Sequence, residues 1–355
     1  MDIQLKNGLI LKVELLTDFI FRIRKRSDRL FNEPAMIKYG IIRKEWPQVQ
    51  FHTEETDEIV IFRTTQTVLK IRKEDGQVSY SDDRENLLLQ EVGTPLSSND
   101  SGFAAEFQLA EDEKLYGLGD ESRYGIQKRG HRAKMWVKNV ESYSPIPFLM
   151  SSRGWGFFLN STWRHFFDLG QTKVDRWKVF SKQGELDYYL IAGSNYAQIL
   201  DRYTDITGKP QLLPLWGYGL TFVCNQQADA REMLDDAMHF RREGIPCDLI
   251  GLEPGWMAKN YDYSINKKWH EDRFYVPYWA PQGPQTFIGA LERSGFKLSL
   301  WLCSDYDITH HEERLAEKRA QPDDERTESS DFHADDFEQD LHMHTPVYLD
   351  KLTKL

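Results

Sequence analysis

Past the middle of the chain, apolar runs typical of buried strands alternate with segments of helical periodicity. An apolar run at 220–224 precedes apolar positions at helical spacing over about 228–243, and a second run follows at 248–252. A helix between two buried runs is the connection that parallel strands require. The alternation continues with a helix at about 284–294 and a strand at 297–303. We therefore predict three parallel strands with intervening helices, as in a (β/α)8 barrel or a doubly wound sheet.

The long aromatic-rich stretch between the second strand and the second helix, residues 254–282, favours the barrel. In barrels, the loops at the carboxyl ends of the strands build the functional site. Glu253 stands where the second predicted strand ends, and Trp256 follows it. Glu253 is therefore the first candidate ligand-binding residue. Its alternative interpretation is a strand-end carboxylate that caps a loop.

The N-terminal part of the chain has a different pattern, with many short runs of strand type and little helix between them. Asn7-Gly8 and Asp75-Gly76 are hairpin dipeptides. The strands that we expect lie at 19–24, 59–63, 67–71, 78–80, 156–160, 178–180 and 186–191. This pattern predicts an antiparallel β-sandwich.

We expect a bridging helix at 194–207, with Ser194 as its N-cap, followed by a proline-containing connector at 208–215. The predicted domains are accordingly a β-sandwich at 1–207 and the start of a (β/α)8 barrel at 208–306.

Residues 307–344 are rich in acidic side chains and poor in apolar ones, so we expect a loosely ordered insertion there. Histidines at 310, 311, 342 and 344 lack a defined metal-ligand spacing, and we expect no metal site. Residues 345–355 are expected to begin the next barrel element.

Composition narrows the class of partner. A net charge of −11 over 355 residues argues against nucleic acid and against an anionic membrane surface. Aromatic residues make up 13% of the chain, which fits sugar stacking and large cores equally well. Three widely spaced cysteines are a poor disulfide framework, and the N-terminus lacks the features of a secretory signal. We therefore expect a cytoplasmic protein.

Several motifs occur together in a fixed order: LYGLGDES (115–122), SPIPFLMSSRGWGFFLNST (144–162), LLPLWGYGL (212–220), LEPGWM (252–257), WHEDRF (269–274) and KLSLWLCSD (297–305). In this order they resemble glycoside hydrolase family 31, the α-glucosidase and α-xylosidase family, over essentially the whole chain. The resemblance implies a β-sandwich followed by the first three or so βα units of a (β/α)8 barrel.

The resemblance also implies a retaining mechanism without a cofactor. One aspartate on the fourth barrel strand is the nucleophile, and a second aspartate two strands later donates and recovers a proton. No segment after the third predicted strand has the strand-then-aspartate form. We therefore expect no catalytic residue within this chain. Both aspartates are expected beyond Leu355, so the fragment alone is predicted to be inactive.

The substrate-binding residues that the resemblance implies lie near the strand ends. Glu253 matches an aspartate that accepts hydrogen bonds from hydroxyls of the sugar being cleaved, and Trp301 matches a tryptophan that lines the same subsite. Trp256 is a further candidate. For both tryptophans the alternative is a core aromatic.

Other substrate-binding candidates lie on neighbouring loops. Asn225 and Gln226 replace an aromatic residue that lines the family's pocket, and Asp262 and Trp269 lie on the long loop. Glu253-Pro254-Gly255 replaces the commoner aspartate-x-aromatic, which opens space beside the sugar. We therefore favour galactose or N-acetylgalactosamine over glucose.

The predicted function is an exo-acting retaining α-glycosidase whose partner is an oligosaccharide or α-glycoside substrate. Two alternatives stay open: a non-catalytic carbohydrate-binding protein, and a transglycosidase or lyase of the same family. A homo-oligomer is compatible with the sequence.

Overall fold

The structure is a computed structural model that describes residues 1–26, 31–93, 102–121, 125–136, 144–224, 228–259 and 268–302. Within these ranges the chain divides into two compact units, residues 1–209 and residues 210–302. All seven strands predicted for the first unit are present, with ends that agree or shift by one or two residues. None of the helices described is long and apolar enough to cross a membrane.

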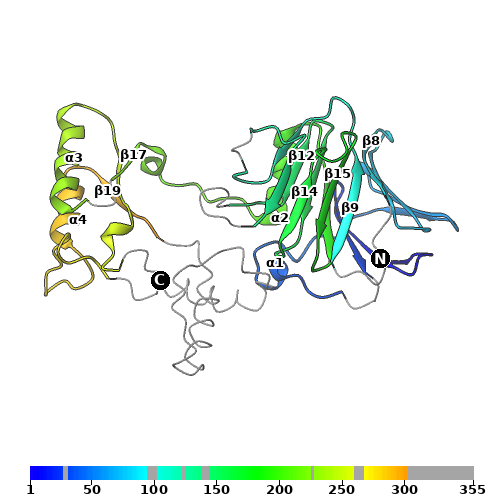
Figure 1. The fold of residues 1–355 in the computed structure, drawn as a ribbon, viewed down its shortest axis with the longest axis horizontal. Helices are drawn as coiled ribbons and strands as arrows, with labels where there is room; N and C mark the ends of the chain where they lie inside the picture. The colour runs from blue at the N-terminus through cyan, green and yellow to red at the C-terminus, as the bar shows by residue number, and fades with distance from the viewer. Residues whose placement is uncertain are drawn as a thin grey trace, which may run out of the picture. The chain divides into compact units, whose positions relative to one another are not determined.

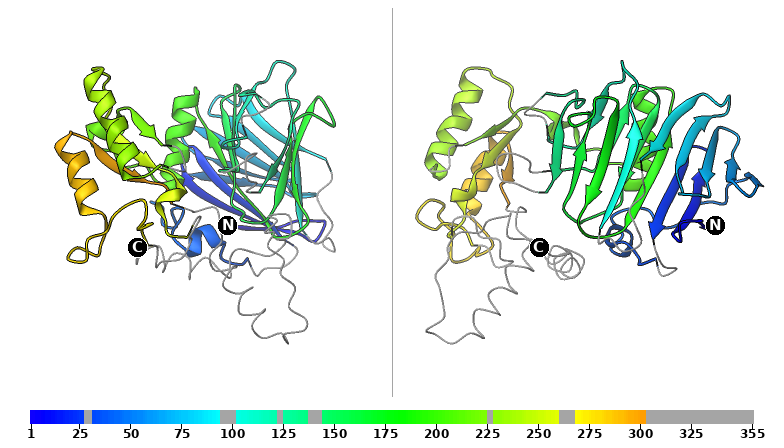
Figure 2. Two further views of the ribbon diagram at one scale, coloured as in Figure 1. Left: turned by 60° about the vertical axis from the view of Figure 1, so that its left-hand side comes forward. Right: turned by 45° about the vertical axis from the view of Figure 1, so that its right-hand side comes forward.

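The first unit contains two antiparallel sheets that face each other, as Figure 2 shows. The seven-stranded sheet has the order β1 (Asp2–Gln4), β2 (Ile10–Thr17), β3 (Ile20–Arg26), β16 (Leu186–Ala192), β13 (Trp155–Leu159), β12 (Phe148–Ser151) and β10 (Leu115–Gly117). The nine-stranded sheet has the order β11 (Arg132–Met135), β14 (His165–Asp168), β15 (Arg176–Ser181), β9 (Phe103–Gln108), β8 (Leu87–Val92), β7 (Val78–Asp82), β6 (Thr67–Arg72), β5 (Ile59–Arg63) and β4 (His52–Glu55). This architecture confirms the predicted antiparallel sandwich.

The Asp75-Gly76 hairpin shows how local sequence sets the strand order. Strands β6 and β7 pair in antiparallel register, with Ile71 opposite Val78. Gly76 between them has a φ of 72°, a conformation that glycine adopts without steric cost. The Asp75 carboxylate accepts a hydrogen bond from the Gln77 amide at 3.1 Å. The turn predicted from this dipeptide is therefore present.

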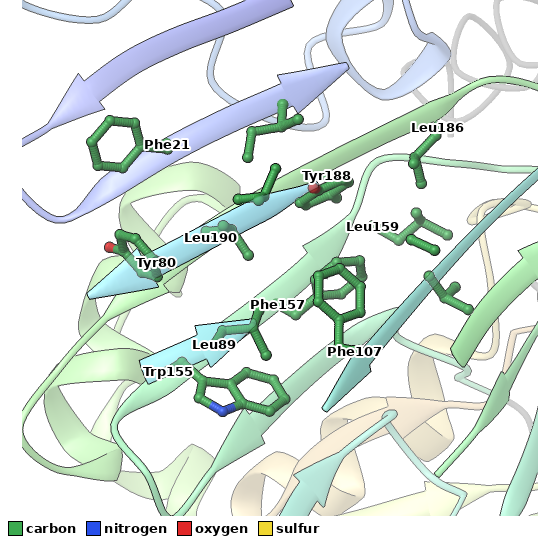
Figure 3. Packing of buried hydrophobic residues seen from close by; sticks show 14 of the residues in the cluster. Phe21, Tyr80, Leu89, Phe107, Trp155, Phe157, Leu159, Leu186, Tyr188 and Leu190 are labelled. Atoms are coloured by element: carbon green, nitrogen blue, oxygen red, sulfur yellow. The ribbon is translucent and has the colours of Figure 1, made fainter. Parts of the chain in front are cut away.

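Aromatic side chains fill the space between the two sheets (Figure 3). Phe107 of the nine-stranded sheet stacks on Trp177 with ring centroids 4.4 Å apart and meets Phe157 of the other sheet edge to face at 5.6 Å. All three rings are fully buried. Burial of each such side chain contributes about 2 to 3 kcal/mol, so these aromatics add substantially to the stability of the sandwich.

Helix α2 (Tyr196–Thr207) covers the outer face of the seven-stranded sheet and buries Ile199 and Ile206 against it. The predicted N-cap was wrong by one residue. Asn195 is the cap, because its side chain accepts a hydrogen bond from the Gln198 amide at 3.0 Å. Ser194 lies one residue earlier, and its hydroxyl donates to the Gln198 side chain at 3.0 Å. A short helix, α1 (Ala35–Lys38), also contributes to this outer layer.

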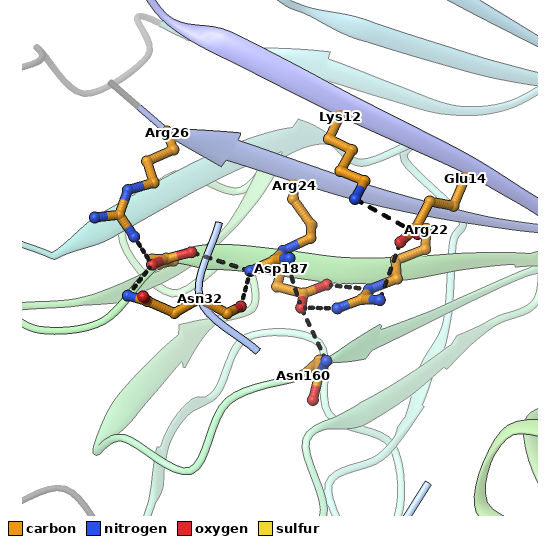
Figure 4. Close-up of polar contacts among 9 residues, drawn as sticks. Lys12, Glu14, Arg22, Arg24, Arg26, Asn32, Asn160 and Asp187 are labelled. Atoms are coloured by element: carbon orange, nitrogen blue, oxygen red, sulfur yellow. Dashed lines mark hydrogen bonds and ion pairs between the residues drawn. The ribbon is translucent and has the colours of Figure 1, made fainter. Parts of the chain in front are cut away.

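Part of the same outer face is a buried polar cluster (Figure 4). Arg22 on β3 makes a two-point contact with the Asp187 carboxylate on β16, at 2.9 and 2.6 Å. Asn160 donates to Asp187 at 2.8 Å. Burial by itself lowers the pKa of the Arg22 guanidinium, but the hydrogen bond and charge of Asp187, with neighbouring charges, outweigh burial and the pKa is raised, so Arg22 stays charged. The cluster thus adds side-chain contacts to the backbone pairing of β3 with β16.

The second unit has the predicted βα order. Strands β17 (Thr221–Val223), β18 (Leu249–Leu252) and β19 (Lys297–Leu300) form a parallel sheet in that spatial order. Helices α3 (Ala230–Arg242) and α4 (Gln285–Arg293) contact each other and cover one face of the sheet, as Figure 1 shows. The strands are shorter than expected: β19 ends at Leu300, where the prediction extended it to residue 303.

Candidate functional site

The predicted sugar-binding carboxylate lies at the carboxyl end of the central strand of the parallel sheet. Glu253 directly follows β18, and it is partly exposed while the residues before and after it are buried. Cys224 follows β17 on one side, and its amide donates to the Gly251 carbonyl at 3.0 Å. Trp301 follows β19 on the other side, and its amide donates to the Leu252 carbonyl at 2.8 Å. The three strand ends therefore place Glu253 between Cys224 and Trp301.

Cys224 contributes a neutral side chain to this site. Burial raises the pKa of its thiol, and the nearby Glu253 charge adds to the rise, whereas a hydrogen bond with the Glu253 backbone lowers it. A thiol with a raised pKa stays protonated at neutral pH and is a poor nucleophile. We interpret Cys224 as a packing partner of the Glu253 backbone. The sequence placed it beside a buried strand, but only the structure shows this contact.

A tight turn follows Glu253. Pro254–Trp256 forms a single 3-10 turn in which the Trp256 amide donates to the Glu253 carbonyl at 3.1 Å. Proline suits the start of such a turn because its φ is fixed near the helical value. All three turn residues are buried, so the Glu253 side chain extends from a rigid base.

Trp256, the last residue of this turn, packs against Trp269. Trp256 is only 5% exposed, and its ring centroid lies 4.8 Å from that of Trp269. Trp269 also meets Phe274 at 5.4 Å and forms an isolated β-bridge with Met257. Both indoles are thus integrated in the hydrophobic core of the second unit. Trp301 is less buried than Trp256.

Asn225, Gln226 and Asp262 lie outside the described ranges, as do the histidines of the acidic segment 307–344. Among the residues that are described, no group of three or more His, Cys, Asp or Glu side chains could hold a metal ion.

Sequence reasoning missed Arg273. Its guanidinium Nη1 donates to the Gly255 carbonyl at 3.0 Å, within the turn that follows Glu253. Arg273 belongs to the WHEDRF motif, which gave a signal for a functional segment but not for this contact.

The chain is a β-sandwich followed by parallel βα units with a carboxylate at a strand end, and comparison with known families identifies this arrangement. Residues 10–168 match the glycosyl hydrolase 31 N-terminal galactose mutarotase-like domain. Residues 210–342 match the glycosyl hydrolases family 31 TIM-barrel domain. The chain belongs to glycoside hydrolase family 31, and its second unit is part of a TIM-barrel domain. Both the predicted resemblance and the predicted fold class are confirmed.

Relatives of this chain include an α-xylosidase and an isomaltosyltransferase. An α-xylosidase from Emericella nidulans is 32% identical over 209 residues, which cover 56% of this chain and 25% of that enzyme. An isomaltosyltransferase from Sporosarcina globispora is 27% identical over 217 residues, covering 55% of this chain and 20% of that enzyme. The chain thus spans about a quarter of the length of these relatives.

The fold is also similar to that of a solved enzyme. A dextranase from Flavobacterium johnsoniae, complexed with isomaltotriose, superposes with a TM-score of 0.71 at 24% identity, covering 83% of this chain and 36% of that one. Because the sequence identity is below 25%, this similarity shows a shared fold and nothing further.

Proposed function

We propose that the gene product carrying this chain is an exo-acting retaining α-glycosidase, and that this chain supplies the floor of its sugar-binding site. The observation that carries the proposal is the position of Glu253, partly exposed between Cys224 and Trp301 at the carboxyl ends of three parallel strands. In barrel enzymes, the residues at these strand ends contact the substrate.

The proposed role of Glu253 is to accept hydrogen bonds from two hydroxyl groups of the bound sugar. Each such bond to a charged acceptor is worth about 1.5 to 3 kcal/mol. The partly exposed Trp301 would offer an apolar surface to the sugar ring. The packed pair of Trp256 and Trp269 would hold the turn in place.

The proposed reaction follows the retaining mechanism. One carboxylate attacks the anomeric carbon to form a glycosyl-enzyme, while a second carboxyl group protonates the leaving oxygen and then activates water. We propose that both groups lie outside the 355 residues. The residues of this chain bind and orient the terminal sugar, which keeps the anomeric carbon in reach of the nucleophile. We also propose that the protein is cytoplasmic.

The sugar is the finer part of the proposal. Glu253-Pro254-Gly255 replaces the commoner aspartate-x-aromatic of the family, so glycine removes a bulky neighbour of the carboxylate while Glu extends one methylene further than Asp. We propose a terminal α-galactosyl or N-acetylgalactosaminyl group, with α-glucosyl and α-xylosyl groups as the alternatives that the named relatives suggest.

A panel of aryl α-glycosides tests the proposal with the purified gene product. We expect turnover of one α-linked sugar and retention of anomeric configuration, measured by NMR of the first product. Turnover of β-glycosides alone, or none at all, would overturn it.

Transfer to another sugar is a second candidate, favoured by the similarity to the isomaltosyltransferase. Product analysis with and without an added oligosaccharide acceptor separates the two. Hydrolysis predicts free monosaccharide in both reactions, whereas transfer predicts a longer oligosaccharide.

A further inference from the structure

The turn that carries Glu253 is held by a separate segment, residues 268–274. The Ala258 amide donates to the Lys268 carbonyl at 2.8 Å, and the His270 amide donates to the Trp256 carbonyl at 2.9 Å. Together with the bridge between Met257 and Trp269, these bonds pair the chain after the turn with this segment. The base of Glu253 is therefore fixed by residues that follow it in the sequence.

Arg273 is the point where this segment contacts two strand-end loops at once. Its guanidinium donates to the Gly255 carbonyl at 3.0 Å, and its own carbonyl accepts from the Ala230 amide, also at 3.0 Å. Gly255 lies in the loop after β18, and Ala230 is the first residue of α3, which follows β17. One residue thus ties the loop that follows the first strand to the loop that follows the second.

The Gly255 carbonyl requires such a partner. Gly255 is buried, and a buried carbonyl without a donor is strongly disfavoured. A charged donor makes a stronger bond than a neutral one. Because Gly255 is only two residues from Glu253, a turn that loses this bond can rotate and move the carboxylate.

We propose that Arg273 is a positioning residue that sets the orientation of the Glu253 carboxylate toward the sugar. This inference rests on the proposed function. According to this inference, Arg273 affects turnover of the substrate by holding Glu253 in its orientation, in addition to any general effect on stability.

A double-mutant cycle in the gene product tests the coupling, with kcat and KM measured on the best aryl α-glycoside. Arg273→Met removes the donor, Arg273→Lys keeps a cationic donor, and Glu253→Gln removes the charge of the sugar-binding residue. Arg231→Met is the matched control, because Arg231 is an exposed arginine on the first turn of α3. Melting temperatures are measured for every variant.

We expect Arg273→Met to lower kcat/KM about tenfold or more, Arg273→Lys to recover part of the loss, and Arg231→Met to leave it unchanged. In the Glu253→Gln background, Arg273→Met should add little further loss, because both changes act on the same contact. Losses that multiply, or an unchanged kcat/KM in Arg273→Met, would overturn the proposal.

Two outcomes separate this inference from the proposed function. If the wild-type protein is active and Glu253→Gln lowers kcat/KM, but the loss from Arg273→Met is the same with and without Glu253→Gln, Arg273 does not act through Glu253 and the inference alone fails. If the wild-type protein turns over no α-glycoside, both fail. If Arg273→Met does not fold, Arg273→Lys replaces it, and its smaller loss must again disappear in the Glu253→Gln background.

Discussion

The indole Nε1 of Trp256 donates a hydrogen bond of 2.9 Å to the backbone carbonyl of Trp301, 45 residues later in the chain. This bond joins the turn after β18 to the end of β19. It therefore relates the position of the Glu253 carboxylate to that of the Trp301 indole, the two groups that we propose contact the sugar from adjacent strands.

Trp256→Phe tests this connection. Phenylalanine keeps an aromatic ring against Trp269 but cannot donate to the Trp301 carbonyl. We expect the free energy of unfolding to fall by about 1 to 3 kcal/mol through the unmet carbonyl and the smaller ring. Urea unfolding of the gene product measures this loss. Trp46→Phe, a change at a tryptophan of the sandwich whose indole bond is exposed, should cost less.

Glu253→Gln tests the proposed sugar contact directly. The amide keeps the shape of the side chain but loses its charge, so a hydroxyl bond that it accepts is weaker. We expect kcat/KM for the best aryl α-glycoside to fall about tenfold or more. Glu243→Gln, at the exposed C-terminal end of α3, is the control and should have no effect. An unchanged kcat/KM in Glu253→Gln would return Glu253 to the role of a loop cap.

The sequence predicted those elements whose signals are local. The Asp75-Gly76 turn and the alternation of apolar runs around β17, β18 and β19 depend on neighbouring residues, so pattern reading found them. Family likeness, not periodicity, singled out Trp301 as a sugar-binding candidate. The position of Glu253 at the end of a predicted strand marks it as a candidate without any family likeness.

Contacts between residues far apart in the sequence could not be predicted from such local patterns. Arg22 meets Asp187 across 165 positions, and Lys25 meets Glu91 across 66, because sheet order alone brings them together. The cap of α2 was misplaced because Ser194 and Asn195 are both good capping residues and only backbone geometry selects between them. The contact of Arg273 with Gly255 was missed because it depends on how a loop folds back.

His165 should make the sandwich unit sensitive to acid. It is buried, its Nδ1 donates to the Trp163 carbonyl at 2.6 Å, and its Nε2 has no hydrogen-bond partner among the residues described. Burial lowers its pKa from 6.5 to about 4. Between these pH values the unfolded chain binds a proton that the folded chain does not, so stability falls as the pH falls.

The expected loss from this group is about 3 kcal/mol between neutral pH and pH 4, since one pKa unit corresponds to about 1.4 kcal/mol. Urea unfolding at several pH values measures it. His165→Gln should flatten the pH dependence in this window, because glutamine can still donate to the Trp163 carbonyl but does not titrate. His52→Gln, a change at an exposed histidine, should leave the slope as it is. Equal slopes in wild type and His165→Gln would contradict the assignment.

A buried ion pair joins the two sheets of the sandwich. Lys25 on β3 contacts both oxygens of Glu91 on β8 at 2.6 Å, and both residues are nearly inaccessible. Removal of one partner leaves a buried charge without compensation, so we expect Lys25→Met to cost about 3 to 5 kcal/mol. The double variant Lys25→Met with Glu91→Leu should be clearly more stable than Lys25→Met alone. Thermal unfolding of the three proteins checks this order, and a double variant as unstable as the single one would contradict it.

The second unit presents apolar surface that we expect to drive self-association of the 355-residue polypeptide. Within the described ranges, β17 and β19 each pair on one side only, and Leu212, Leu215 and Tyr278 are 90 to 91% exposed. Open strand edges and exposed apolar side chains both favour aggregation. Light scattering should therefore show oligomers or aggregates that grow with concentration, and aryl α-glycosides should not be hydrolysed. A polypeptide limited to residues 1–209, which lacks these strands, should scatter as a monomer. A monomeric 355-residue chain with measurable turnover would contradict both expectations, because it would place the catalytic carboxylates within the chain and its strand edges out of reach of other molecules.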